Sequence, residues 1–417
     1  MYALYTAVTA VLFVLAAPFF LWKGRASGKY LRTFRARMAW GGPSSEIDSI
    51  WVHAVSVGEV LVARPLIERL KRRFPETPLF VSTTTLTGQD MAQNTLTGID
   101  GVFFAPFDWP RPVRRTLRRL NPRLLVLVET EIWPNLIHEA HRRGVRIAIV
   151  NGRISPRSFG RYRRIRRLLT RVLHDVDAFL MQGEAHAARA LDIGAPSERV
   201  RTTGNLKFDS LSHAGVSERL RHLIPAGGPL WVAGSTVEGE EAVVLAAFAR
   251  LREEVPDLRL LLAPRHPDRF GEAEAAAHRA GLSCVCRSTL RTPWTGTEVL
   301  LLDTLGELAQ VYSLATVVFV GGSLVPRGGH NVLEAAIHGK AVVVGPHMEN
   351  FQEICDLFLS AGGLVQVANG RALTEAVRAL LLDEGHRVRV GDAARGLIDA
   401  QRGAVDRTVD ALAELVA

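Results

Sequence analysis

The chain has 417 residues, of which 22% are charged and 47% are hydrophobic. This composition fits a globular protein of two ordinary-sized domains and excludes a disordered chain. The three cysteines, Cys284, Cys286 and Cys355, argue against a disulfide framework and cannot make a four-cysteine zinc site. We therefore expect a protein of a reducing compartment.

Residues 1–22 form an uncharged segment about as long as a bilayer core requires. No basic residue precedes the segment, whereas several follow it: Lys23, Arg25, Lys29, Arg32, Arg35 and Arg37. The positive-inside rule then places the rest of the chain in the cytoplasm, and a cleaved signal peptide would carry its positive charge in front. We expect a membrane anchor, and leave open whether the segment spans the bilayer, lies on its surface or docks on a domain.

Behind this segment, residues 23–210 alternate short apolar runs with helical patterns such as 60–73 and 134–143. Alternating strands and helices indicate a parallel sheet that is covered on both faces. The predicted strands are 50–55, 79–82, 101–104, 124–128, 146–150 and 178–181.

Glu59 follows the first of these strands, in the sequence WVHAVSVGE (51–59). The strand ends at a small turn and Glu59 opens a helix, which places a carboxylate where open α/β sheets bind ligands. Near a helix start, a carboxylate is stabilised as the anion and can act as a general base. The alternative is a capping glutamate with no catalytic task.

Glu129 and Glu131 directly follow the apolar strand of LLVLVETEIWPN (124–135). Two acids at the end of a buried strand are unfavourable unless they are exposed in a cleft or paired. Arg153 or Lys207 could pair with them. A metal site is conceivable, but no set of His, Asp and Glu at convincing spacing joins them.

The segment RYRRIRRLLTRVL (161–173) combines arginines with apolar residues at helical spacing. It belongs to a basic half of the chain, because residues 1–210 contain 32 Lys and Arg but 17 Asp and Glu. A basic amphipathic helix suits an anionic membrane or a phosphorylated lipid. Nucleic acid is the rival partner, although aromatic residues are few, and a solvated basic face is the third possibility. The arginines expected to face such an anionic lipid surface are Arg161, Arg163, Arg164, Arg166 and Arg167.

Three further segments of this half contain polar residues of interest. Lys207, in TGNLKFD (203–209), can contact a phosphate or a carboxylate, or can simply be solvent-exposed. Asp175 and Asp177 resemble the D-x-D metal motif of some glycosyltransferases, but they precede a predicted strand and fit an entry turn better. His138 and His141 lie on a predicted surface helix, where we expect them to be solvated.

A second series of strands and helices begins after residues 212–228, where the charge balance also changes. We therefore predict two doubly wound α/β domains of similar size, 23–210 and 211–400, which enclose a cleft. The last helix, within residues 401–417, could pack back on the first domain. The predicted strands of the second domain are 230–233, 258–263, 282–285, 299–302, 316–320 and 341–344.

The stretch TVVFVGGSLVPRGGHNVLEAA (316–336) is a strand, a glycine-rich loop and a helix start. Its glycines allow close approach of a ligand, and Asn331 is a plausible N-cap. Amides at a helix start favour a phosphate, and Glu334 can accept hydrogen bonds from ribose hydroxyls. The stretch lacks the endings of a Walker loop and of a dinucleotide fingerprint, so an ordinary strand–loop–helix connection remains the alternative.

Other strand ends of this domain add polar groups on the same edge of the sheet. Arg265, at the end of a strand in LLAPRHPDRF (261–270), suits a phosphate. The backbone of residues 305–307, in LLDTLGELAQVY (301–312), suits the edge of a nucleobase.

Six segments together resemble the bacterial 3-deoxy-D-manno-octulosonic acid (Kdo) transferases of lipopolysaccharide synthesis. In chain order they are HAVSVGE, ETEIWPN, NLKFD, APRHPDRF, DTLGEL and VGGSLVPRGGHNVLEAA. The resemblance implies a GT-B fold of two Rossmann-like domains, an inverting transfer from CMP-Kdo to a lipid A precursor (lipid IVA), and an inner-membrane location. We expect no cofactor and no metal, because CMP has only one phosphate and a bridging metal is less needed than for a nucleoside diphosphate.

The resemblance also implies roles for individual residues. Glu59 would be the catalytic base, and Glu129 and Lys207 would stabilise the transition state. Residues 23–210 would bind the acceptor, and residues 211–400 would bind CMP. The CMP-contacting positions would be Pro264, Arg265, Leu305, Gly306, Glu307, Asn331, Val332, Leu333 and Glu334.

Two rival functions remain open. One is a GT-B glycosyltransferase that moves a sugar from a UDP donor to another membrane lipid. The other is a membrane-anchored protein that binds anionic lipid or nucleic acid and catalyses nothing. Only a catalyst needs carboxylates at strand ends.

Overall fold

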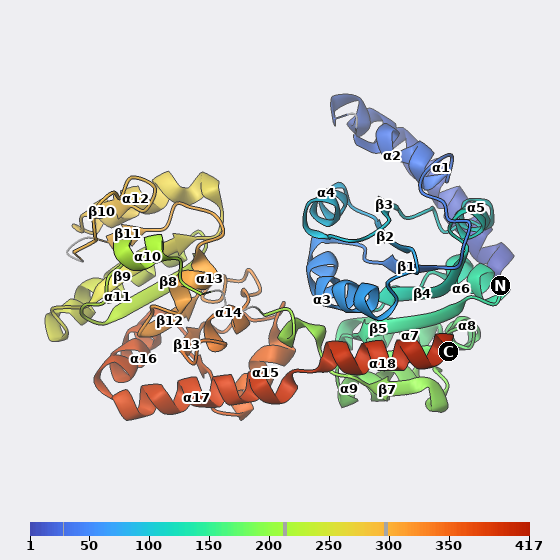
Figure 1. Cartoon of the computed structure of the whole chain (residues 1–417). Helices are drawn as coiled ribbons and strands as arrows, with labels where there is room; N and C mark the ends of the chain where they lie inside the picture. The colour runs from blue at the N-terminus through green and yellow to red at the C-terminus, as the bar shows by residue number, and fades with distance from the viewer. Residues whose placement is uncertain (28, 212–214, 296–298) are drawn as a thin grey trace. The chain divides into compact units, whose positions relative to one another are not determined.

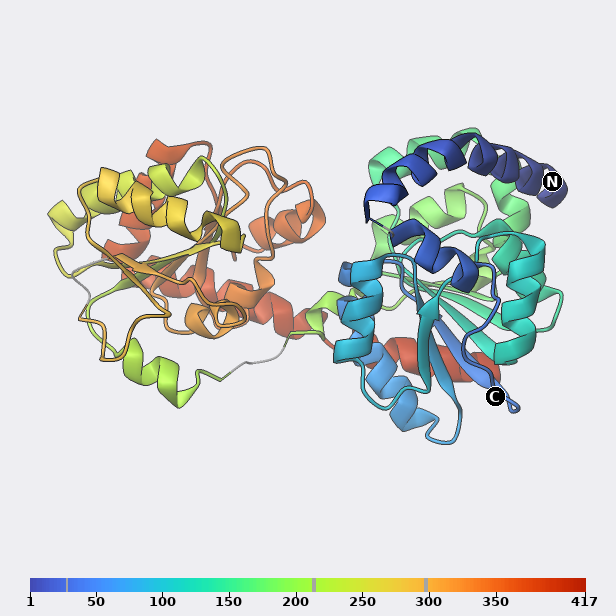
Figure 2. The ribbon, with the colours of Figure 1, turned by 90° about the horizontal axis from the view of Figure 1, so that it is seen from above.

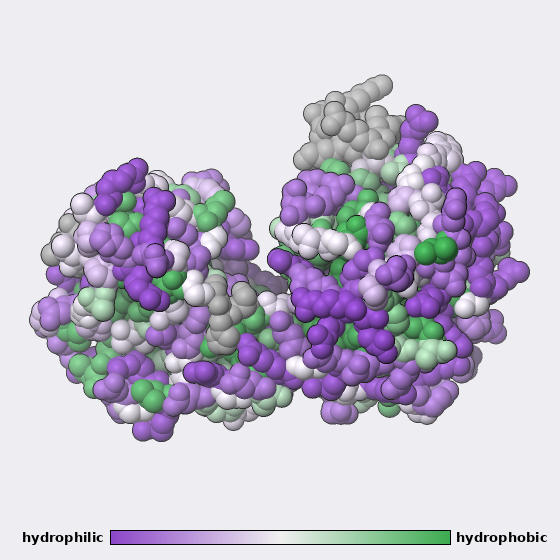
Figure 3. Space-filling model, in the orientation of Figure 1, coloured by the Kyte–Doolittle hydropathy of each residue, from purple (hydrophilic) through white to green (hydrophobic). Residues whose placement is uncertain are grey.

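A computed structural model describes residues 1–27, 29–211, 215–295 and 299–417, and the side chains of residues 17–32 lie outside the description. The chain divides into two compact units (Figure 1). Unit 1 comprises Met1–Ser210 with Gln401–Ala417, and unit 2 comprises Leu211–Ala400. Hydrophilic residues predominate on the face of both units that Figure 3 shows.

Unit 1 contains a parallel seven-stranded sheet in the order β3-β2-β1-β4-β5-β6-β7. The six strands predicted for this half are confirmed, and β7 is an additional, short strand at the edge. The strand order reverses between β1 and β4, and such a switch point is where open α/β sheets bind ligands. The strands are β1 (Ser49–His53), β2 (Leu79–Thr83), β3 (Gly101–Phe104), β4 (Pro122–Val128), β5 (Arg146–Gly152), β6 (Ala178–Met181) and β7 (Val200–Thr202).

Helices cover both faces of this sheet, because successive residues of a buried strand point to opposite faces. Ile50 and Val52 pack in one hydrophobic cluster, whereas Trp51 between them packs in the other. The helices of unit 1 are α1 (Tyr2–Ser27), α2 (Lys29–Arg37), α3 (Val57–Arg73), α4 (Leu86–Thr95), α5 (Pro110–Leu120), α6 (Pro134–His141), α7 (Pro156–Arg164), α8 (Arg166–Leu173), α9 (Glu184–Asp192) and α18 (Ala404–Val416), with short 3-10 turns η1 (Ser197–Arg199) and η2 (Leu206–Phe208).

The C-terminal helix α18 lies in unit 1, against α3 (Figure 2). Asp209 caps its start, because the two carboxylate oxygens accept hydrogen bonds from the Gly403 and Val405 amides at 2.8 and 2.6 Å. Leu412 is fully buried in the same cluster as Ile50. The last residues of the chain thus complete the core of the first unit.

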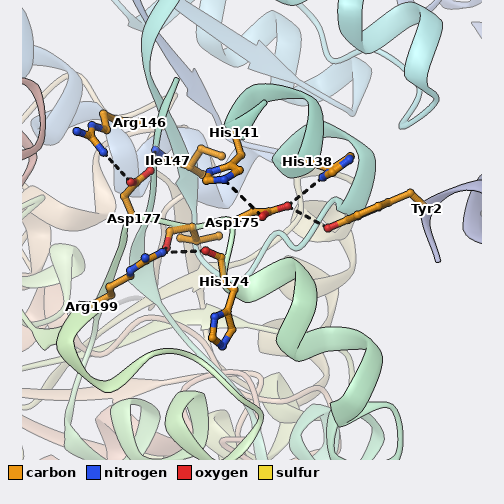
Figure 4. Close-up of polar contacts among 10 residues, drawn as sticks. Tyr2, His138, His141, Arg146, Ile147, His174, Asp175, Asp177 and Arg199 are labelled. Atoms are coloured by element: carbon orange, nitrogen blue, oxygen red, sulfur yellow. Dashed lines mark hydrogen bonds and ion pairs between the residues drawn. The ribbon is translucent and has the colours of Figure 1, made fainter. Parts of the chain in front are cut away.

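The first turn of α1 is attached to unit 1 by an aromatic and a polar contact (Figure 4). The Tyr2 ring stacks on His138 with centroids 3.8 Å apart. The Tyr2 hydroxyl donates a hydrogen bond to Asp175 Oδ2 at 3.0 Å. The start of the N-terminal segment thus packs against the α/β domain of unit 1, one of the three possibilities that the sequence left open.

Within the described residues, we find no helix with the length and apolar character that crossing a bilayer requires. The spanning form of the anchor expected at residues 1–22, one of the possibilities left open, is therefore not supported, and the side chains of residues 17–22 lie outside the description. The face of α1 away from its contacts is nevertheless apolar and exposed. It includes Leu4, Val8, Val11, Leu12 and Leu15.

The D-x-D segment is a strand-entry turn. Asp177 accepts the Ile147 amide at 2.8 Å, which joins the start of β6 to β5 (Figure 4). Asp175 contacts His138 Nδ1 at 3.1 Å and His141 Nε2 at 3.8 Å. The expectation that both histidines are merely solvated is therefore wrong.

Unit 2 contains a second parallel seven-stranded sheet, in the order β10-β11-β9-β8-β12-β13-β14. Its order reverses between β8 and β12. The strands are β8 (Leu230–Thr236), β9 (Arg259–Pro264), β10 (Cys284–Cys286), β11 (Val299–Leu301), β12 (Val317–Val320), β13 (Ala341–Val344) and β14 (Val365–Gln366). The prediction of two parallel-sheet α/β units is thus confirmed.

Helices also surround the sheet of unit 2. They are α10 (Glu218–Leu223), α11 (Glu240–Glu254), α12 (Phe270–Arg279), α13 (Leu308–Tyr312), α14 (Leu333–Ala336), α15 (Gln352–Ser360), α16 (Gly370–Leu382) and α17 (Glu384–Gln401), with the 3-10 turn η3 (Pro267–Arg269).

Candidate active site

Glu59 lies in the first turn of α3, directly after β1, at the switch point of unit 1. The residue is largely buried, with 8% of its surface exposed. One carboxylate oxygen accepts the Val55 amide at 2.8 Å and the other accepts the Ser56 hydroxyl at 2.9 Å. These bonds fix both oxygens at the carboxyl end of the sheet.

Burial raises the pKa of Glu59 to about 7, and the nearby charges of Glu131 and Glu129 add to this rise. The hydrogen bonds from Val55 and Ser56 act in the opposite direction. A carboxylate with a pKa near the ambient pH is both available as a base and basic enough to take a proton. Glu59 therefore fits the predicted role of a general base, and this role stays a prediction.

Glu129 and Glu131 follow β4, the strand next to β1. Glu129 has a left-handed φ of +62°, which is unusual for a residue with a side chain. Glu131 accepts a hydrogen bond from Trp133 Nε1 at 2.7 Å. Burial raises the pKa of Glu131, and the charge of Glu129 adds to the effect. Glu59, Glu129 and Glu131 thus lie close enough at this edge for their charges to interact.

In unit 2, the predicted nucleotide residues follow β9, β11 and β12. The Arg265 amide donates to Thr236 O at 2.8 Å, which ties the end of β9 to the end of β8. Asn331 Nδ2 donates to Glu334 Oε1 at 3.1 Å. Burial raises the pKa of Glu334, while the bond from Asn331 and the charge of Arg265 lower it. Arg265 and Glu334 therefore lie within electrostatic reach of each other.

The helix start near Asn331 differs from the expectation. The N-cap is Val332 and α14 has only four residues, so its dipole is weak. Asn331 Oδ1 still accepts the Leu333 amide at 3.1 Å, as a capping side chain does. The binding of a phosphate at this place would therefore depend more on the charge of Arg265, and less on the amides of the helix start, than the sequence indicated.

Glu240 is a further organising residue that the sequence did not reveal. It is fully buried and accepts four backbone amides, those of Val237, Gly322, Ser323 and Leu324, at distances of 2.7–3.0 Å. The first part of the glycine-rich loop is thus bonded to α11 and does not present these amides to a phosphate. The loop lies over eighty positions from Glu240 in the sequence, so no local pattern identifies this residue.

In the loop before α13, the Glu307 carboxylate is hydrogen-bonded within the protein, whereas Leu305 is exposed. Arg287 Nη2 donates to Glu307 Oε1 at 2.8 Å, and Thr304 also bonds to this carboxylate. Leu305 is 76% exposed, and Gly306 has a φ of +81°. The Glu307 carboxylate is thus already engaged, and contact of the backbone of residues 305–307 with a nucleobase stays a prediction.

Comparison with known proteins identifies the family. The model of the 3-deoxy-D-manno-octulosonic-acid transferase (kdotransferase) family matches residues 32–210. A 3-deoxy-D-manno-octulosonic acid transferase of Haemophilus influenzae is 34% identical over 93% of this chain and 92% of its own. One of Bordetella pertussis is 35% identical over 95% and 96%. The chain belongs to the Kdo transferase family. It is thus a glycosyltransferase, and the resemblance of the six motifs is confirmed.

The fold of this Kdo transferase family member also has distant structural neighbours. A UDP-GlcNAc 2-epimerase of Neisseria meningitidis, bound to UDP-GlcNAc, superposes with a TM-score of 0.61 at 12% identity, covering 87% of this chain and all of its own. At this identity the likeness concerns the fold alone, which is of the GT-B type.

No group of His, Cys, Asp and Glu in the described parts of the chain could hold a metal ion. The two carboxylates of the D-x-D segment are instead bonded to histidines and to a backbone amide of the protein.

The basic segment forms two short helices, not the single helix expected. α7 ends at Arg164 and α8 begins at Arg166, with Ile165 between them. Leu169 is buried, whereas Ile165 and Leu168 are about half exposed. The five predicted arginines are all exposed: Arg161, Arg163, Arg164, Arg166 and Arg167.

Proposed function

We propose that the enzyme transfers Kdo from CMP-Kdo to a hydroxyl group of a lipid A precursor by a single displacement with inversion. The observation that carries the mechanism is Glu59, which is buried at the switch point, held by two hydrogen bonds and has a pKa of about 7. An acceptor hydroxyl is a poor nucleophile, so a base must take its proton as it attacks.

In this reaction, the acceptor oxygen bonds to the anomeric carbon of Kdo while its proton passes to Glu59. The bond from that carbon to the phosphate oxygen breaks, and CMP leaves with the electron pair. Lys207 and Glu129 stabilise the charges that develop in the transition state. Because the acceptor oxygen attacks from the face opposite CMP, the anomeric configuration inverts.

The donor is held by unit 2 in this proposal. Arg265 neutralises the phosphate, and Glu334 accepts hydrogen bonds from the ribose. The backbone of Leu305 and Gly306 binds the cytosine, and Pro264 with residues 331–333 completes the contacts. The charge of Arg265 acts on the Glu334 carboxyl and lowers its pKa, which supports this arrangement because phosphate and ribose are adjacent in CMP.

The acceptor reaches unit 1 from the cytoplasmic side of the inner membrane. The exposed apolar face of α1 supports an interfacial position for this helix, with its axis along the membrane surface. The exposed arginines of α7 and α8 would contact lipid phosphates, and no nucleic acid is required as a partner.

Incubation of the enzyme with CMP-Kdo and tetra-acylated lipid A precursor, followed by mass spectrometry, tests the reaction. We expect a product heavier than the acceptor by one or more Kdo units. CMP should compete with the donor and UDP should not. An unchanged acceptor, or competition by UDP alone, would contradict the proposed donor.

A further inference from the structure

The segment that carries Lys207 is attached to β5 by a side chain. Asn151, near the end of β5, accepts a hydrogen bond from the Leu206 amide through Oδ1 at 3.0 Å. Asn151 is completely buried. The bond spans 55 positions of sequence and fixes the start of η2, in which Lys207 lies.

A second path of hydrogen bonds connects the same two places. Gln182 Nε2 donates to the backbone oxygen of Asn151 at 3.0 Å. Asn205 Nδ2 donates to Gln182 Oε1 at 3.1 Å. Asn205 Oδ1 in turn accepts the amide of Lys207 itself at 3.0 Å. Both paths therefore constrain the backbone at Lys207.

The backbone of Asn151 adopts an uncommon conformation. Its φ is +53°, a left-handed value that glycine adopts more readily. The pairing of β5 with β6 shifts register between Val150 and Gly152, so Asn151 is the extra residue of a bulge. Bulges re-aim a side chain and are frequent beside active sites.

The environment of Asn151 adds two further observations. Its Nδ2 has no hydrogen-bond partner among the described residues, although it is buried. The neighbouring strand end carries Glu129, which also has a left-handed φ and whose amide bonds to Val150 O at 2.8 Å. Residues in sparsely populated conformations cluster where function requires them.

We propose that Asn151 is a positioning residue for Kdo transfer, which holds Lys207 at the carboxyl end of the sheet that also carries Glu129. This inference rests on the role proposed for Lys207. Asn151 acts through the backbone of Leu206, and it takes no proton and forms no bond to substrate.

Two substitutions separate positioning from a structural role. Asn151→Gly and Asn151→Ala both remove the acceptor of the Leu206 amide, but only alanine keeps a Cβ at positive φ. The alanine variant should therefore melt at a lower temperature than the glycine variant. We expect kcat to fall by a similar factor in both, about tenfold to a hundredfold, with Michaelis constants little changed. The proposal would be overturned if Asn151→Gly kept the kcat of the wild type. It would also be overturned if the alanine variant, with the lower melting temperature, lost much more kcat than the glycine variant.

Asn121→Gly is the matched control. Asn121 also has a left-handed φ, of +45°, but it ends α5 and bonds to Asp48 at the surface. Its replacement should leave kcat unchanged. If Asn121→Gly lost as much kcat as Asn151→Gly, the loss would be a general effect of replacing an asparagine of left-handed φ. That result would overturn the proposed role of Asn151 in positioning Lys207.

Lys207→Met, made in the wild-type and Asn151→Gly backgrounds, tests the route of the effect. Residues that act as a unit have non-additive effects, so Lys207→Met should cost much less kcat when Asn151 is already glycine. Effects that multiply would overturn the inference. If Lys207→Met alone leaves kcat intact, the role of Lys207 fails and the inference with it, while Kdo transfer by the wild type tests the reaction separately.

Discussion

At the scale of single residues, Glu59 lies in an environment that is unfavourable for a charged carboxylate. Its burial and the adjacent charges of Glu129 and Glu131 hold its pKa at about 7, well above that of a solvated glutamate. The two hydrogen bonds from Val55 and Ser56 keep it in place without abolishing its basicity.

Glu59→Gln should lower kcat by about a hundredfold or more, because glutamine keeps the shape of the side chain but cannot take a proton. The affinity for CMP, measured by calorimetry, should hardly change. Glu68→Gln, in the same helix but at the surface, is the control. Near wild-type turnover in Glu59→Gln would make the base assignment wrong.

The pH dependence of turnover follows from the same group. Glu59 accepts a proton only when it is ionised, so kcat should decline as the pH falls below about 7, where the raised pKa leaves it protonated. A profile of kcat against pH, measured from about 5 to about 9, checks this decline. A rate that stays flat down to about pH 5, close to the ordinary pKa of glutamate, would contradict the raised pKa.

Glu334→Ala should weaken CMP binding by roughly 1.5–3 kcal/mol, because the variant loses a charged acceptor for ribose hydroxyls. Calorimetric titration with CMP measures the change. Glu375→Ala, which removes an exposed carboxylate of α16 in the same unit, should leave the affinity unaltered. If Glu334→Ala binds CMP as the wild type does, this residue is no ligand contact.

At the scale of elements, the exposed arginines of α7 and α8 are expected to attract the phosphorylated acceptor. Replacing Arg161, Arg163, Arg164, Arg166 and Arg167 with glutamine should raise the Michaelis constant for acceptor and reduce its salt dependence. CMP affinity should be unaffected. The control is the same replacement of Arg64, Arg69, Arg72 and Arg73 on α3. A Michaelis constant and salt slope equal to those of the wild type would leave the segment as a solvated face.

The sequence predicts a strand well where the strand is buried on both faces, because such a strand consists of consecutive apolar residues. The strand at 124–128 is buried on both faces, so its composition alone identifies β4. By contrast, β7 and β14 are short and partly exposed, and neither has an apolar run. The docking of α1 depends on Tyr2 and His138, which are far apart in sequence, and so no local pattern predicts it.

The same distinction applies to the site. Glu59 and Glu129 are predictable because the ends of parallel strands meet at one edge of a sheet. Glu240 and Asn151 are not, because the loop amides that bond to Glu240 lie 82 to 84 positions away and the Leu206 amide lies 55 positions from Asn151. The left-handed φ of Asn151 cannot be predicted from the sequence either, because asparagine also occurs in many turns where its φ is negative.

At the scale of the whole molecule, the chain is organised as two sheets with polar groups at the switch point of each. The first unit holds the proposed base, and the second holds the proposed nucleotide contacts. The C-terminal helix α18 belongs to the first unit, where Asp209 bonds to its start. The C-terminus therefore contributes to the core of the unit that holds Glu59 and not to the unit of the nucleotide site.

The anomeric configuration of the product, compared with that of CMP-Kdo by nuclear magnetic resonance, tests the central claim most directly. A single displacement with Glu59 as base predicts an inverted configuration and one CMP released for each Kdo transferred. Retention of configuration, or a covalent Kdo–enzyme intermediate, would contradict the mechanism.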